Sequence, residues 1–87
     1  MTDDSLLSQI KQAENKFEQG HTKEAIQDFL DLNDKSPDNP QILNNLGVIS
    51  YTLGYLNEAY GYFKKAISAD PKYQQAYVKS GNQLFRS

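Results

Sequence analysis

The chain has 87 residues, with 9 basic and 11 acidic side chains, no cysteine and a formal net charge of −2. This length fits one small domain, the missing cysteines exclude disulfides and thiolate zinc sites, and the weakly negative charge argues against a general nucleic-acid binder. No apolar run approaches the roughly 20 residues of a membrane span, and the amino-terminal residues lack the pattern of a secretory signal, so we expect a cytoplasmic protein.

Apolar residues recur at helical spacing along most of the chain. The first segment shows this with Leu6, Leu7, Ile10, Ala13 and Phe17. Further along, an asparagine followed by a proline at 39–40 is typical of a helix cap and first helical position, and the prolines at 37 and 71 mark the ends of the preceding helices. The pattern predicts an all-α chain of five helices, near residues 4–19, 22–35, 39–53, 56–69 and 72–86.

The sequence also repeats itself with a period of 34 residues. Under this shift, turn and packing residues coincide: Gly20 with Gly54, Glu24 with Glu58, Ala25 with Ala59, Phe29 with Phe63, and Pro37 with Pro71. A further shift aligns two more sets: Ala13 with Gly47 and Gly81, and Phe17 with Tyr51 and Phe85. Because helix axes approach closely only where bulk is missing, the repeated small residues predict close helix crossings.

These positions resemble the tetratricopeptide repeat (TPR) family, a helix-turn-helix unit of about 34 residues with the pattern W-x2-L-G-x2-Y, A-x3-F and P. The match is best within residues 40–73, although Leu43 stands in place of the Trp and Ser50 in place of the Tyr. The resemblance implies antiparallel helix-turn-helix repeats stacked in a short right-handed superhelix. It divides a single domain, residues 1–87, into a first repeat at 6–39, a second at 40–73, and a capping or partial third-repeat helix at 74–87.

In this family the first helices of the repeats line a concave groove that binds a peptide or helix of a partner protein. The resemblance therefore implies a noncatalytic protein–protein interaction module. Carried over by position, the predicted groove residues are Ile10, Lys11, Glu14, Phe17, Asn44, Asn45, Val48, Tyr51, Thr52, Lys79, Asn82 and Phe85. The three aromatic residues have two interpretations, because their shared position borders both the groove and the packing between helices.

One TPR subfamily clamps the C-terminal carboxylate of chaperones with a Lys, two Asn and two further basic residues. Asn45 and Lys79 match that set, but Ile10, Glu14 and Gln75 occupy the other three positions. Glu14 would repel a carboxylate at a position where an amide donor is needed. The sequence therefore disfavours a chaperone-tail clamp.

The candidates for catalysis or metal binding are few. His21, the single histidine, falls in a predicted turn, and Asp28, Asp31 and Asp34 recur along one helix without the glycine and glutamate of a calcium loop. No phosphate-binding glycine loop or nucleophile motif occurs. We therefore predict no catalytic residue, no metal, no cofactor and no enzymatic activity for this chain.

Two alternatives to peptide binding stay open. The chain has 4 basic and 9 acidic side chains in residues 1–39 but 5 and 2 in residues 40–87, and opposite charges favour head-to-tail self-association, with the last helix as the contact. The chain could also be the accessory N-terminal part of a larger enzyme or assembly. RNA binding is disfavoured by the acidic balance and by Glu14.

Overall fold

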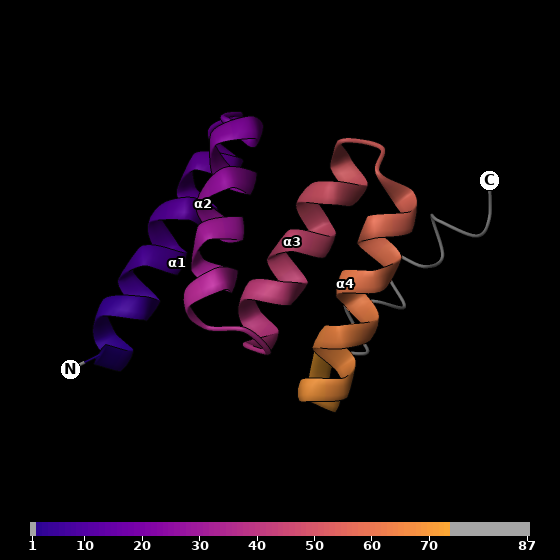
Figure 1. Ribbon diagram of the computed structural model, residues 1–87. Helices are drawn as coiled ribbons and strands as arrows, with labels where there is room; N and C mark the ends of the chain where they lie inside the picture. Colours follow the sequence, from indigo (N-terminus) through magenta and orange to yellow (C-terminus); the bar gives the residue numbers. More distant parts are fainter. Residues whose placement is uncertain (1, 74–87) are drawn as a thin grey trace.

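The computed structural model describes residues 2–73, and side chains from Ser5 onward. These residues form the helices α1 (Thr2–Glu18), α2 (Thr22–Lys35), α3 (Pro40–Thr52) and α4 (Leu56–Ala69), followed by a short 3₁₀ helix, η1 (Pro71–Tyr73). Successive helices run in opposite directions and form two hairpins that lie side by side (Figure 1). The predicted all-helical fold is confirmed. The fifth predicted helix, apart from its first residues in η1, lies outside the described residues.

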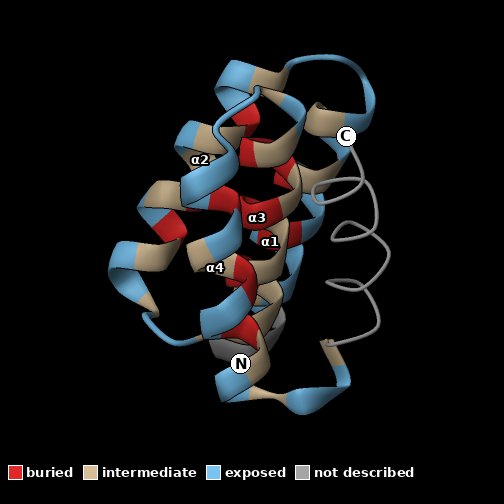
Figure 2. Cartoon of the chain, turned by 90° about the vertical axis from the view of Figure 1, so that its right-hand side faces the viewer, coloured by how far each residue is buried: buried red, intermediate tan, exposed pale blue. Residues whose placement is uncertain are grey.

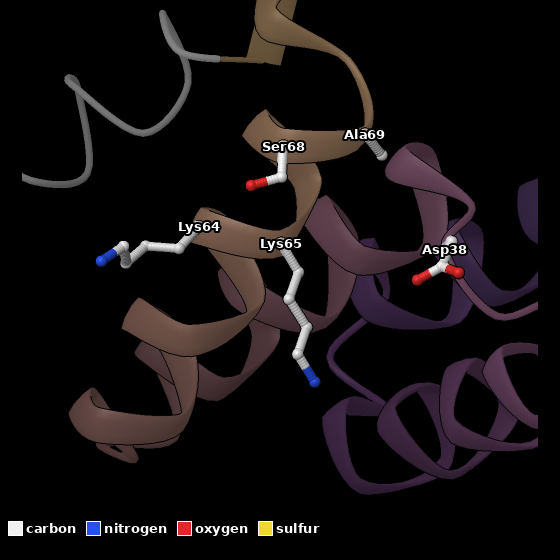
Figure 3. Close-up of a pocket in the computed structure, with 5 residues that line it drawn as sticks. All are labelled: Asp38, Lys64, Lys65, Ser68 and Ala69. Atoms are coloured by element: carbon white, nitrogen blue, oxygen red, sulfur yellow. The ribbon is translucent and has the colours of Figure 1, made fainter.

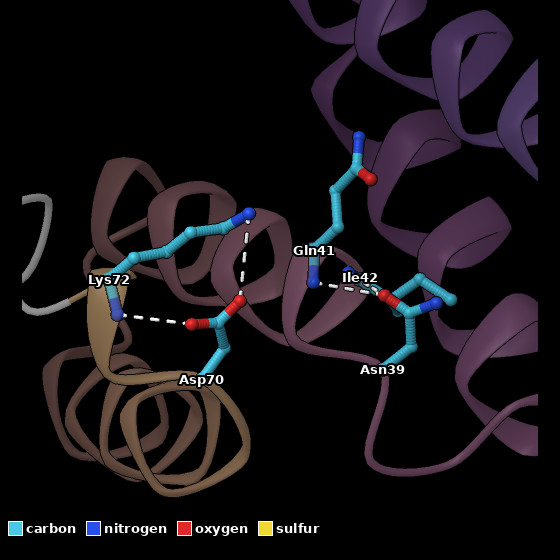
Figure 4. A network of polar contacts seen from close by, with 5 residues as sticks. All are labelled: Asn39, Gln41, Ile42, Asp70 and Lys72. Carbon is cyan, nitrogen blue, oxygen red and sulfur yellow. Dashed lines mark hydrogen bonds and ion pairs between the residues drawn. The ribbon is translucent and has the colours of Figure 1, made fainter.

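The start of α3 is fixed by the cap that the sequence predicts. The side-chain oxygen of Asn39 accepts hydrogen bonds from the backbone N–H groups of Gln41 at 2.9 Å and Ile42 at 3.3 Å (Figure 4). Pro40 occupies the first helical position, where a missing N–H costs no hydrogen bond. At the end of α4, Asp70 Oδ1 likewise accepts from the backbone N–H of residue 72, and this contact starts η1 (Figure 4).

The turns within the two hairpins have the same geometry. Gly20 and Gly54 both adopt positive φ, 93° and 88°, a conformation that costs glycine little and other residues more. In each turn the N–H after the glycine donates to a carbonyl five residues earlier, from His21 to Lys16 and from Tyr55 to Ser50, both at 2.8 Å. This is the Schellman pattern that ends helices. The repeat seen in the sequence is therefore also a repeat of backbone hydrogen bonds.

The core lies along the lines where the helices face one another (Figure 2). The buried apolar side chains are Ile10, Ala13, Ala25, Phe29, Leu32, Ile42, Leu43, Leu46, Ile49, Ala59, Phe63 and Ala66. All four helices contribute to this set, so each hairpin packs within itself and against the other. Burial of this apolar surface is what stabilises so short a chain.

Helices α3 and α4 approach each other closely at Gly47. A Cβ atom built on Gly47 would lie 2.7 Å from Cε1 of the Phe63 ring, closer than real Cβ atoms come to a neighbour. Phe63 itself is fully buried. The predicted close crossing at Gly47 is confirmed, whereas its repeat counterpart Gly81 lies outside the described residues.

Candidate functional site

The predicted groove residues within residues 2–73 all lie on α1 or α3, the first helix of each hairpin. Five of them define what we call the α1–α3 face: Lys11, Glu14, Asn45, Val48 and Thr52. Lys11 and Thr52 are exposed, while the other three are half-buried. The remaining predicted groove residues Lys79, Asn82 and Phe85 lie outside the described residues.

Ile10 does not belong to this face. Its side chain is 1% exposed and belongs to the core cluster. The reason lies in the spacing of α1, where Ile10, Ala13 and Phe17 share the stripe that packs inward. The groove prediction was therefore wrong for Ile10, because a core residue offers a partner no surface.

A hydrogen bond between side chains joins the two helices at the centre of the face. Asn45 Nδ2 donates to Glu14 Oε2 at 2.9 Å and also to the backbone carbonyl of Gln41 at 2.9 Å. Since an amide nitrogen carries two hydrogens, both donors of Asn45 are used within the protein. Asn45 therefore has no N–H left for a ligand carboxylate, which strengthens the case against a chaperone-tail clamp.

Thr52 makes a similar bond at the far end of α3. Its hydroxyl donates to the backbone carbonyl of Val48 at 2.9 Å, so the oxygen faces other groups only as an acceptor. Val48 adds a half-buried apolar surface between Asn45 and Thr52. Apart from the exposed cation of Lys11, the face thus combines apolar area with hydrogen-bond acceptors.

The other predicted groove residues within residues 2–73 are Phe17, Tyr51 and Asn44. Phe17 is half-buried and packs against the core cluster, which favours the interpretation of this residue as packing between helices. Tyr51 and Asn44 are half-buried on α3, and the Asn44 side-chain oxygen is enclosed without a hydrogen-bond partner. Their role in a groove stays a prediction.

Sequence reasoning missed one apolar residue on the same side of α1. Leu7 is 49% exposed, although its place in the apolar pattern suggested core packing. It precedes Lys11 by four residues and Glu14 by seven, so the three residues lie on the same side of the helix. The spacing to Glu14 was the signal that could have assigned Leu7 to the face.

Comparison with known protein families decides what the second hairpin is. Residues 40–73, which comprise α3, α4 and η1, match the family model of the tetratricopeptide repeat. The chain contains a tetratricopeptide repeat. These are also the residues that the sequence assigned to a second repeat. No curated protein matches the chain.

Outside the α1–α3 face, a charged hollow beside α4 lacks a converging set of groups. It measures about 350 Å³ and is lined by Asp38, Lys64, Lys65, Ser68 and Ala69. Lys64 and Lys65 point in different directions, and the carboxylate of Asp38 stands apart from both (Figure 3). The TPR unit therefore presents solvated charges here rather than a built binding site.

The acidic residues of α2 contact different side chains and do not gather into one site. Asp28 forms an ion pair with Lys16 of α1 at 2.7 Å, and this hydrogen-bonded partner raises the pKa of Lys16 above its ordinary value of 10.5. Asp31 instead accepts a hydrogen bond from Gln27. His21 is exposed and lies 3.7 Å from a carboxylate oxygen of Glu24 in the same turn. Within the described residues, no three His, Cys, Asp or Glu side chains gather as metal ligands.

Of the helices in residues 2–73, none has both the length and the apolar character that crossing a bilayer requires.

Proposed function

We propose that this chain is a noncatalytic protein–protein interaction module that binds a peptide or helix of a partner protein on the α1–α3 face. Tetratricopeptide repeats generally mediate interactions between proteins, and residues 40–73 match that family. The observation that carries the proposal is the Glu14–Asn45 hydrogen bond, which holds α1 and α3 together at the centre of one shared surface.

Several features support binding at this surface. Leu7 and Val48 offer apolar area that a partner would remove from water, while Glu14 and Thr52 offer acceptors that fix orientation. Because the surface lies on two helices packed against a common core, it is rigid before a partner arrives, which lowers the entropic cost of binding.

The proposal extends to the rest of the chain. It keeps the single domain of residues 1–87, with repeats at 6–39 and 40–73 and a capping or partial third-repeat helix at 74–87. In this arrangement Lys79, Asn82 and Phe85 continue the groove. A cytoplasmic location is also part of the proposal.

The test is capture of a partner by the immobilised chain and by two matched variants. Val48→Arg places a long cation on the α1–α3 face, and Ser68→Arg places the same side chain at an exposed position of α4. We expect the native chain and Ser68→Arg to retain a partner that Val48→Arg loses, with all three proteins equally helical by circular dichroism. Equal retention by the folded Val48→Arg variant would contradict the proposal.

A further inference from the structure

The hydrogen-bond polarity of the α1–α3 face points to one class of partner. Both N–H groups of the Asn45 side chain are used, one by Glu14 and one by the carbonyl of Gln41. The hydroxyl hydrogen of Thr52 is used by the carbonyl of Val48. These side chains therefore present oxygen lone pairs to a partner. The partner must supply hydrogen-bond donors opposite them.

The negative charge of Glu14 favours a donor that carries a positive charge. Among the described residues, Glu14 has a neutral amide as its partner, and no ion pair joins it to a cation. Asp28 shows the contrast, because Lys16 approaches it to 2.7 Å. Lys11 lies one turn before Glu14 but is exposed and does not pair with it. A half-buried carboxylate of this kind attracts a positive charge from outside.

We propose that the α1–α3 face binds a lysine or arginine side chain of an extended partner segment, which donates a hydrogen bond to the carboxylate of Glu14. This inference rests on the proposed function and names its partner class. The exposed Leu7, two turns before Glu14 on α1, and the half-buried Val48 on α3 offer apolar surface for the aliphatic stem of the cation or for a neighbouring apolar residue. A carboxylate-bearing segment finds no free amide donor on Asn45 and is repelled by Glu14.

The experiment titrates the ¹⁵N-labelled full chain with three pools of short peptides, acetylated and amidated at their ends. The pools share the same leucine, serine and glycine positions and differ at one central residue, which is Lys or Arg, Asp or Glu, or Asn or Gln. We expect the basic pool alone to shift the NMR signals of the Asn45 side chain and the Val48 amide. Glu14→Gln, which keeps an oxygen to accept from Asn45, should weaken that binding about tenfold.

Two comparisons keep the result specific. Lys65→Ala removes a cation from an exposed position of α4, outside the α1–α3 face, and should leave binding of the basic pool unchanged. Raising the salt concentration should weaken binding of this pool to the native chain. This measurement does not depend on whether a variant folds.

The unfavourable outcomes separate the two proposals. Equal or tighter binding of the acidic or neutral pool at Asn45 and Val48 would overturn the basic-partner inference and leave the binding face intact. Binding of the basic pool that Glu14→Gln does not weaken would also overturn it. Failure of every pool to shift signals of the face would count against both this inference and the proposed function.

Discussion

The contact between Gly47 and Phe63 gives the sharpest test of the packing. In Gly47→Ala, the new Cβ would lie 2.7, 2.8 and 3.0 Å from three carbons of the Phe63 ring. The ring is fully buried, so it cannot move aside without disturbing the core. Such overpacking costs about 1–3 kcal/mol, while alanine in place of glycine within a helix stabilises by about 1 kcal/mol. The expected net loss is therefore about 0–2 kcal/mol.

Gly61 supplies the matched control. It also lies within a helix, but no atom of the described residues comes within 4 Å of a Cβ built there. Gly61→Ala should therefore show the helix preference alone and stabilise the protein by about 1 kcal/mol. The two variants should differ by about 1–3 kcal/mol in the free energy of unfolding, measured by urea denaturation with circular dichroism.

The partner of the clash can be tested in the same assay. Phe63→Leu removes ring atoms, so the cost of adding the Gly47→Ala methyl group should fall when both changes are combined. We expect a coupling energy of about 0.5–3 kcal/mol in the double-mutant cycle. If Gly47→Ala proved as stable as Gly61→Ala, or if the two changes were additive, the close approach of α3 and α4 would be refuted.

Four further predictions use the same unfolding measurement. Asn39→Ala removes the acceptor for two N–H groups of α3 and should cost about 1 kcal/mol, whereas an unchanged midpoint would contradict the cap. Gly54→Ala should cost about 1–2 kcal/mol because φ is 88°, even though the site is spacious. Ala59→Leu overpacks a fully buried position and should cost about 1–3 kcal/mol. The ion pair with Asp28 raises the pKa of Lys16, so its stabilisation is complete from neutral pH up to pH 10.5 and disappears as pH rises through the raised value. The difference in the free energy of unfolding between the native chain and Lys16→Gln should therefore disappear as the pH rises above 10.5. A difference that stays constant would refute the role of charge.

Local chemistry explains why much of the fold was predictable from the sequence. The cap at Asn39 and the positive φ of Gly54 depend on neighbouring residues alone, so residue type and position suffice to predict them. The crossing at Gly47 was predictable for a different reason. Its position is small in each repeat unit, and an aromatic residue recurs at a fixed distance along the chain.

The candidate site was harder to predict because it depends on how α1 is rotated against its neighbours. Apolar residues fill positions 6, 7 and 10, which is more than one narrow stripe can bury, and only packing decides that Ile10 turns inward and Leu7 outward. The hydrogen-bond partner of Asn45 could not be predicted from the sequence for a related reason. Glu14 is 31 residues away in the sequence, so the loss of free amide donors becomes visible only when α1 and α3 are placed side by side.

In the proposed function, a partner protein contacts the α1–α3 face. The most direct measurement places a photo-crosslinking amino acid at Val48 on that face or at Lys65, an exposed position of α4, and irradiates each chain with the captured partner. We expect a covalent adduct with the partner from position 48 and none from position 65. An adduct from position 65 alone would contradict the proposed function.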